Sequence, residues 1–373
     1  MAGQRFTSLD VFRGLTVAFM IVVNTSGPGA EPFAQLSHAK WFGLTLADLV
    51  FPAFLFAVGN AMSFGDPKAG TAGVYLWKVV KRAAILFLLG YLMYWFPFVQ
   101  ATADGWALNP VEHTRIPGVL QRIALCFLAA AVAVRWLDIP KLIGLCAVLL
   151  LGYWGALLAF GPPGEQFSQL GNIGAQIDRA VIGIDHMYAK GKGYDPEGLF
   201  STLPAIVNVL AGYLAGRYIR SQSDLRPDLR QVAIRLAIAG AVIIAAALAW
   251  SLAFPLSKRL WTSSFALINI GIDLGLLAGL IAYVELAKLR FGVRFCEVFG
   301  RNPLAIYLFS ELLVTVLQLI RLPSGKGLYD VAGALFQAVV PGALGALLCA
   351  IAYMLVCWGF GYALDRNRIL IKI

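Results

Sequence analysis

Apolar runs of about 20 residues recur from one end of the chain to the other, each long enough to cross a hydrocarbon core of about 30 Å as a helix. Clusters of Gly, Pro and charged residues bound the runs. Because backbone polar groups cannot stay unpaired in lipid, we expect the runs to be helical. The predicted spans are residues 9–25, 43–64, 75–98, 117–136, 139–160, 200–219, 231–254, 262–286, 299–320 and 335–363.

Composition supports this pattern. Hydrophobic residues make up 60% of the 373 residues and charged residues 13%, whereas soluble domains are about 45–50% apolar. We therefore expect an all-α, polytopic integral membrane protein of about ten transmembrane helices, embedded in lipid as a single domain over residues 1–373.

The formal net charge of +10 raises the question of a nucleic-acid partner. About two thirds of the 30 Lys and Arg residues fall on the side of the predicted spans that holds both termini. The positive-inside rule then places both termini in the cytoplasm and accounts for the excess charge, so no nucleic-acid partner is expected. It also places His38 on the extracytoplasmic face.

The longest connection, at about 161–199, lies on the same extracytoplasmic face. Within it Ile173, Ile177, Val181 and Ile184 recur at three- and four-residue spacing, which predicts a short amphipathic helix on the membrane or over a cavity. A loop of this length is typical of a lid or a binding element.

Polar residues inside apolar spans are costly and need a partner or a function. Asp10 and Arg13 are three residues apart and can pair on one helix face. Asn24 closes the first span and is either a C-terminal cap or a site residue. Asp48 lies in the second span, ten residues after His38, and is either a structural hydrogen-bond partner or a site residue.

Arg122 lies inside the fourth apolar run and either snorkels to the interface or clamps an anionic group. Asp273 and Glu311 are further carboxylates within spans, and the sequence leaves their roles open. Among the three histidines, His113 and His186 fall in connections, whereas His38 lies at the mouth of a span. On the residues alone, His38 is either an ordinary polar residue there or a catalytic base.

Several function classes lose support. The sequence has no Walker lysine motif, no G-x-S-x-G elbow and no H-E-x-x-H. The five cysteines lie in or beside apolar runs without a C-x-x-C, so no metal site is expected.

Six blocks, in order, resemble the heparan-α-glucosaminide N-acetyltransferase family: "LDVFRGLTVAFMIVVN", "HAKWFGLTLADLVFPAFLFAVG", "RIPGVLQRIA", "YDPEGLFSTLPAI", "KRLWTSSFAL" and "FGRNPLAIY". The lysosomal members carry an extra luminal region and a span before the first block. The resemblance therefore implies a bacterial member made of the membrane domain, multi-pass in the cytoplasmic (inner) membrane. It also suggests a homodimer.

The resemblance implies transfer of an acetyl group from cytoplasmic acetyl-CoA to the amine of a glucosamine-type sugar across the membrane. It assigns His38 as the catalytic histidine, with Asn24 beside it and Asp48 in the same polar site. An ammonium must lose a proton before it can attack a thioester, and histidine as a residue type, with an ordinary pKa of about 6.5, suits that task. Whether the histidine acts as a base or as a transient acetyl carrier stays open.

For acetyl-CoA, the resemblance favours Arg122 in the polar site and Trp261 and Ser263 along the donor's arm. A basic cytoplasmic mouth for the donor's phosphates is available in Lys78, Lys81, Arg82, Arg217, Arg294 and Arg301. All of these also follow from the positive-inside rule.

Two alternatives remain. A glycan O-acyltransferase also opens with an L-D-x-x-R-G stretch, although such enzymes usually close the first span with a histidine where this chain has Asn24. A sugar transporter needs the same polar cavity within the membrane, and the chain shows no obvious inverted repeat.

Overall fold

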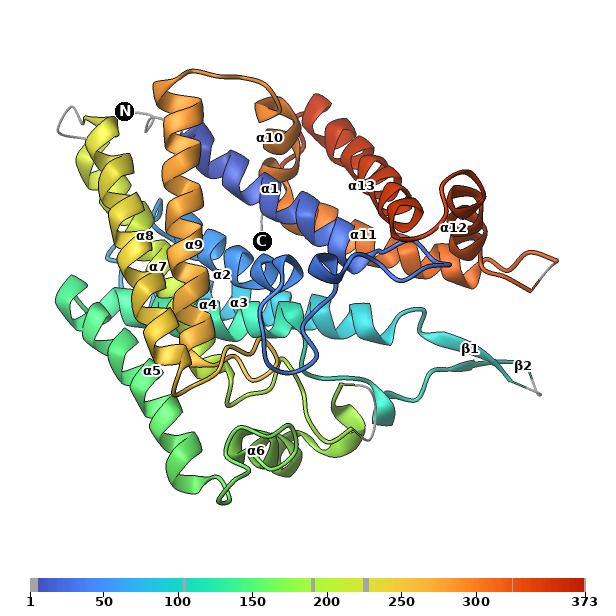
Figure 1. Cartoon of the computed structure of the whole chain (residues 1–373), viewed down its shortest axis with the longest axis horizontal. Helices are drawn as coiled ribbons and strands as arrows, with labels where there is room; N and C mark the ends of the chain where they lie inside the picture. The colour runs from blue at the N-terminus through green and yellow to red at the C-terminus, as the bar shows by residue number, and fades with distance from the viewer. Residues whose placement is uncertain (1–5, 103–104, 189–191, 224–227, 324, 372–373) are drawn as a thin grey trace.

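The computed structural model describes residues 6–102, 105–188, 192–223, 228–323 and 325–371. Within these ranges the chain is mainly helical (Figure 1). The helices are α1 (Thr7–Asn24), α2 (Leu46–Met62), α3 (Ala72–Trp95), α4 (Val119–Trp136), α5 (Ile139–Phe160), α6 (Ile173–Ile182), α7 (Thr202–Ser223), α8 (Leu229–Ser251), α9 (Ser263–Leu280), α10 (Val293–Arg301), α11 (Pro303–Leu319), α12 (Leu328–Val339) and α13 (Ala343–Arg366).

Six helices in the described part of the chain are long and apolar enough to cross a membrane, namely α1, α4, α5, α8, α9 with its π-helical extension (Ile281–Leu286), and α13. The bent pair α10 and α11 counts as a seventh if it forms one span. The chain is therefore a multi-pass, mainly α-helical membrane protein. The count of ten and the cytoplasmic termini stay predictions; α2, α3 and α7, with 17, 24 and 22 residues, occupy the other predicted positions.

Two predicted spans are wrong as continuous helices. The span predicted at 335–363 is divided between α12 and α13, because Pro341 has no N–H to continue a helix and Gly342 has a φ of +83°. The span predicted at 299–320 bends by 84° between α10 and α11, where Pro303 starts the second helix. An antiparallel hairpin of β1 (Val99–Thr102) and β2 (Gly105–Leu108) after α3 was not predicted.

Helices α1 and α2 cross the middle of the molecule, with α7, α8 and α9 on one side and α10 to α13 on the other (Figure 1). Glycines allow the closest approach between α2 and α7. A Cβ on Gly59 would lie 1.9 Å from the carbonyl oxygen of Val209, and one on Gly212 would lie 2.0 Å from that of Phe56. Small residues are the usual means of close helix packing in membranes, so these two helices form a rigid pair.

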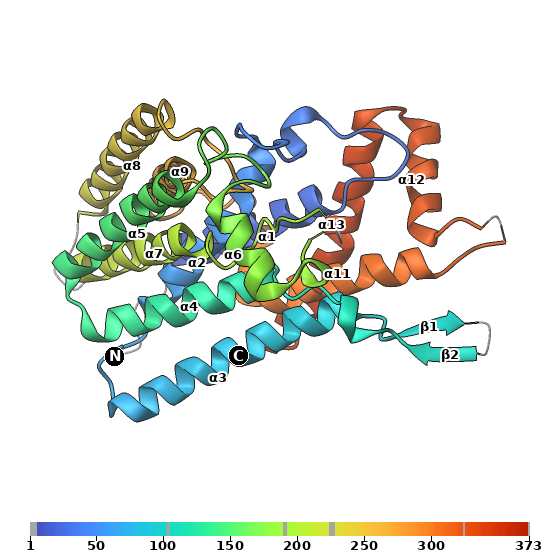
Figure 2. The ribbon, with the colours of Figure 1, turned by 90° about the horizontal axis from the view of Figure 1, so that it is seen from below.

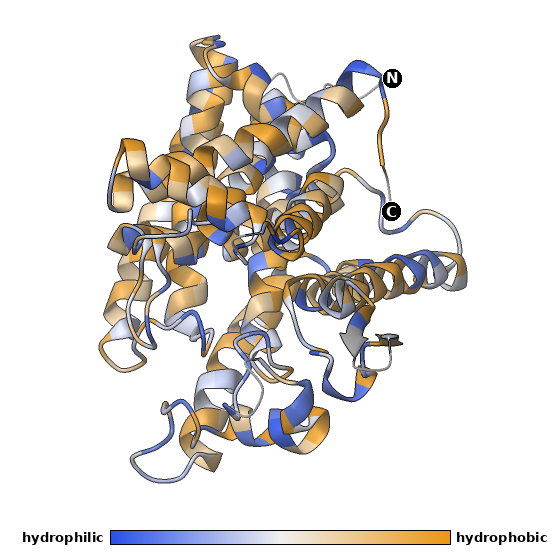
Figure 3. Cartoon of the chain, turned by 90° about the vertical axis from the view of Figure 1, so that its right-hand side faces the viewer, coloured by the Kyte–Doolittle hydropathy of each residue, from blue (hydrophilic) through white to orange (hydrophobic). Residues whose placement is uncertain are grey.

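Three connections contact one another at one end of the bundle and are called the interlocked connections: residues 25–45, 161–201 and 252–262. The Gly43 N–H donates to the carbonyl of Leu256 at 2.8 Å, and the Trp41 indole N–H donates to that of Phe167 at 2.8 Å. Seen from below, the connection that contains α6 lies in front of α1 and α2 (Figure 2). The connections are also more hydrophilic than the helices (Figure 3).

The predicted short amphipathic helix is confirmed as α6. Asn172 caps it by accepting a hydrogen bond from the Ala175 N–H at 2.9 Å.

We expect Gly59→Val to lower the melting temperature by several degrees or to prevent folding, because its side chain would meet the backbone of α7. Thermal unfolding of the purified protein in detergent measures this. Gly152→Val is the matched control, since a Cβ there meets nothing within 4 Å. Equal melting temperatures for the two variants would contradict the close contact of α2 with α7.

Candidate active site

The carboxylate of Asp48 organises the residues before α2. Asp48 is fully buried in the first turn of that helix. Its Oδ2 accepts hydrogen bonds from the Thr45 N–H at 3.1 Å, the Thr45 hydroxyl at 3.0 Å and the Ala39 N–H at 3.2 Å. A carboxylate at this position also faces the positive end of the helix dipole. These contacts fix the backbone of residues 39–45 against the helix.

The other carboxylate oxygen of Asp48 holds His38. Asp48 Oδ1 lies 2.9 Å from His38 Nδ1. A carboxylate on one ring nitrogen favours the proton there, which leaves Nε2 as the basic nitrogen. The His38 side chain is 38% exposed, so the pair combines a buried carboxylate with a reachable imidazole.

Lys258, from the turn between α8 and α9, faces the same imidazole. Its Nζ lies 3.0 Å from His38 Nε2 and 3.1 Å from Nδ1. Burial lowers the pKa of Lys258 to about 8, and the carboxylates of Glu197 and Asp48 oppose this shift. A substantial fraction of this amine is therefore neutral near pH 8.

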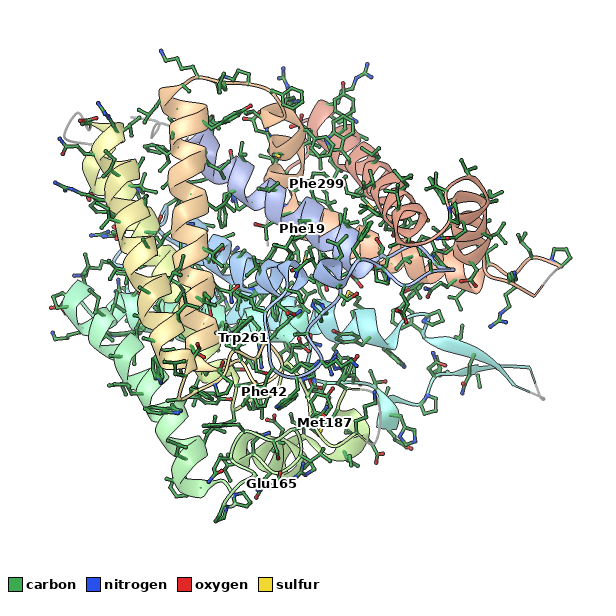
Figure 4. The ribbon with its side chains drawn as sticks, viewed as in Figure 1. Phe19, Phe42, Glu165, Met187, Trp261 and Phe299 are labelled. Atoms are coloured by element: carbon green, nitrogen blue, oxygen red, sulfur yellow. The ribbon has the colours of Figure 1, made fainter. Side chains whose placement is uncertain are left out.

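His38 and Lys258 line a cavity of about 190 Å³, here called the histidine cavity, which opens among α1, α2, the start of α4 and the three interlocked connections. Its polar lining is Asn24, His38, Arg115, Tyr188, Glu197, Lys258 and Arg259. Figure 4 shows Phe42, Met187 and Trp261, one residue from each connection, in the half of the view opposite Phe299 of α10.

Asn24 lines the histidine cavity at the end of α1, and its side-chain N–H donates to Glu311 Oε1 of α11 at 3.1 Å. The direct partner of His38 is thus Asp48, while Asn24 faces the same space from another helix. One N–H of the Asn24 amide is engaged with Glu311, and the second N–H and the oxygen remain for a ligand.

A charged cluster forms another wall of the cavity. The guanidinium of Arg115 contacts Asp195 at 2.6 Å and Glu197 at 2.5 Å. Burial raises the pKa of Asp195, whereas Arg115, acting against burial, lowers that of Glu197. Glu197 therefore carries a negative charge, which is paired with Arg115 and also interacts with Lys258.

A second cavity, of about 120 Å³ and here called the arginine cavity, lies at the opposite ends of α1 and α2. Its polar groups are Arg13 and Arg82, and its walls are apolar residues of α2, α3 and α4. The Arg82 guanidinium stacks 4.8 Å from the centre of the Phe127 ring. No carboxylate among the described residues pairs with Arg82, whereas Arg13 donates to Asp10, as predicted.

The other residues predicted for acetyl-CoA lie elsewhere. Arg122 is buried beside the connection before α7, where it donates to the Gly198 carbonyl at 2.9 Å, and its guanidinium lies 4.9 Å from the centre of the Trp261 ring. Ser263 donates to the Leu150 carbonyl at 2.7 Å. Arg122, Trp261 and Ser263 therefore form a structural layer next to the histidine cavity and do not line either cavity.

Lys78 is exposed on α3. Arg301 of α10 is paired with Asp365 of α13, which also accepts from Arg294.

Sequence reasoning missed Lys258, Glu197 and Arg115 as site residues. All three lie within the blocks that carried the resemblance: "RIPGVLQRIA" begins with Arg115, "YDPEGLF" contains Glu197 and "KRLW" contains Lys258. Nothing in the chain order placed these blocks opposite His38, because the contact joins residues 220 positions apart.

The fold and cavity define a class: a multi-pass membrane protein with a histidine–aspartate pair beside a cavity at one end of its helix bundle. The family model described as "Heparan-alpha-glucosaminide N-acetyltransferase, catalytic" matches residues 5–254, and the chain belongs to this family of acyltransferases. Asn24, His38 and Asp48 all fall within the matched range, and Lys258 lies just beyond it.

Two curated relatives carry the name heparan-alpha-glucosaminide N-acetyltransferase. The mouse protein is 27% identical over 366 residues, which covers 84% of this chain and 54% of the relative. The human protein is 26% identical over 362 residues, with 82% and 53% covered. The chain spans about half the length of these relatives.

We expect Asp48→Ala to release the backbone that precedes α2, because it removes the acceptor for the Ala39 and Thr45 amides. Hydrogen exchange should accelerate by about tenfold or more in residues 38–45 and change little in residues 52–62. Asp138→Ala, which removes another helix-capping carboxylate, at α5, is the control. Unchanged exchange at 38–45 would refute this role of Asp48.

Proposed function

We propose that the protein is a transmembrane N-acetyltransferase that moves the acetyl group of acetyl-CoA to the amine of a glucosamine-type sugar. The observation that carries this proposal is the His38–Asp48 pair in a cavity that also holds Glu197 and Asn24. Membership of the acetyltransferase family supports it.

The acceptor enters the histidine cavity. A sugar ammonium passes one proton to His38 Nε2, and the surroundings that disfavour the ammonium of Lys258 also promote this transfer, while Asp48 stabilises the imidazolium. The free amine attacks the thioester carbonyl and the C–N bond forms. The C–S bond then breaks, and the excess proton on the nitrogen passes to the leaving thiolate, which departs as the thiol. The free N–H of Asn24 would donate to the oxyanion of the intermediate.

The donor approaches from the other end of the same helices. Along α2, Val50 and Phe51 line the histidine cavity, and Phe54 and Ala57 line the arginine cavity. Phe54 is three positions after Phe51, which corresponds to about 4.5 Å of helix rise. We propose that the acetyl-bearing arm of acetyl-CoA occupies the arginine cavity and reaches His38 through this thin partition.

Arg13 and Arg82 are the cations nearest to the proposed donor path and would hold its phosphates, with Lys78 further out on α3. Arg82 is the strongest candidate, because Arg13 is engaged with Asp10 and Arg301 with Asp365. We place the arginine cavity on the cytoplasmic side and the histidine cavity on the extracytoplasmic side of a bacterial inner membrane. A homodimer stays a prediction from the resemblance.

We expect His38→Ala to lower turnover with glucosamine by about 10²- to 10⁴-fold while acetyl-CoA binding persists, because it removes the base and not the donor site. A coupled thiol-release assay and calorimetric titration measure the two quantities. His113→Ala, at an exposed position, is the control and should behave as wild type. Near-wild-type turnover of His38→Ala would contradict the role of His38 as the base.

The donor path has its own test. Ala61→Phe places a ring in the arginine cavity and should raise KM for acetyl-CoA by about tenfold or more, with KM for the sugar little changed. Ala159→Phe, at an exposed position on α5, controls for the added bulk. If Ala61→Phe keeps the wild-type KM for acetyl-CoA, the arginine cavity is not the donor path. Sugar counterflow without acetyl-CoA would instead identify a transporter.

A further inference from the structure

Lys258 occupies the place that an acceptor amine needs. The amine to be acetylated must lie within hydrogen-bond distance of the basic nitrogen of His38, and the Lys258 Nζ already lies 3.0 Å from Nε2. Both side chains line the histidine cavity. A primary amine of the protein is therefore held against the proposed base.

The surroundings of Lys258 favour its nucleophilic form. The charged groups that face it are His38 and Asp48 from before and within α2, Glu197 from the connection before α7, and Arg259 on its own turn. Arg122 adds a further positive charge from α4. Burial and these cations outweigh the two carboxylates, so the amine loses its proton more readily than an exposed lysine does.

We propose that Lys258 is itself an acetyl acceptor, modified by the protein's own donor when no sugar fills the histidine cavity. This inference rests on the proposed function, because acetyl-CoA supplies the acetyl group. The neutral Nζ attacks the thioester carbonyl; a C–N bond forms and the C–S bond breaks. The excess proton on nitrogen passes to His38 Nε2, and the CoA thiolate takes up a proton to leave as the thiol.

The product is an amide, which does not return its acetyl group to a sugar. Acetylation removes the positive charge of Lys258 and places an acetamide next to His38, in a cavity of about 190 Å³ that the sugar must enter. Self-acetylation therefore blocks acetyl transfer to the sugar. A bound sugar protects the protein because its amine displaces the Lys258 amine from His38.

The test uses the full-length protein in lipid nanodiscs, incubated with trideuteroacetyl-CoA so that the label differs from any acetylation acquired during expression. Peptide mass spectrometry then measures label at Lys258 and at Lys40, an exposed lysine two residues after His38. We expect at least tenfold more label at Lys258, resistance of that label to hydroxylamine, and its suppression by excess glucosamine.

Two variants show whether the label depends on the site. His38→Ala should abolish the label at Lys258 and leave the slow background at Lys40. Lys258→Arg should remove the label from its own peptide, and prior incubation with acetyl-CoA should no longer reduce its remaining sugar transfer. An acetyl group on His38 would be removed by hydroxylamine, so the two products are distinguishable.

The pH dependence gives a further readout. Below the pKa of an amine, each pH unit changes the neutral fraction tenfold, so a lysine with a pKa of about 8 gains about tenfold in labelling rate from pH 7 to pH 9. A lysine with an ordinary pKa of about 10.4 gains about 100-fold. A 100-fold gain at Lys258 would contradict the lowered pKa of its amine.

The outcomes separate this inference from the proposed function. Sugar acetylation with no more label at Lys258 than at Lys40 overturns the inference alone. Label at Lys258 without transfer to any amino sugar supports the inference and overturns the proposed acceptor. If neither the sugar nor Lys258 is acetylated, both fall.

Discussion

One buried carboxylate holds the site together. Asp48 is fully buried, yet all of its contacts serve the loop in front of α2 and the imidazole of His38. A buried carboxylate is tolerated only where hydrogen bonds satisfy both of its oxygens. The Ala39 and Thr45 amides and the Thr45 hydroxyl satisfy one oxygen of Asp48. The other oxygen is then available to orient His38. The site is therefore built from the start of a helix, which is more rigid than a free loop.

The same helix links that site to the opposite end of the bundle. Helices α1 and α2 run antiparallel, and each contributes to both cavities: Asn24 at the end of α1 and Arg13 nearer its start, and Phe51 and Ala57 along α2. The close contact of Gly59 with α7 fixes α2 in place. Transfer of an acyl group across a membrane needs one cavity for the donor and one for the acceptor. If the wall between them is thin, the acyl group can cross it without movement of the whole helix bundle.

The sequence predicted the helical class and most helix positions, because apolar runs of membrane length are a strong local signal. The sequence-based prediction was wrong where an apolar run contains a helix-breaking proline. Pro303 and Pro341 lie inside predicted spans, and the continuous apolar pattern around them led to the prediction of unbroken helices. His38, Asn24 and Asp48 were found through the resemblance, and the structure brings His38 and Asp48 into contact. Lys258 and Glu197 were missed because their relation to His38 depends on how distant connections fold together, which local patterns do not encode.

The central claim is that donor and acceptor meet from opposite sides of the membrane. The most direct measurement traps glucosamine inside proteoliposomes, supplies acetyl-CoA only outside, and assays the lumen for N-acetylglucosamine, with His38→Ala vesicles as the blank. We expect product in the lumen, made by the molecules whose arginine cavity faces outward. Product that forms only when glucosamine and acetyl-CoA share one side of the membrane would contradict the account.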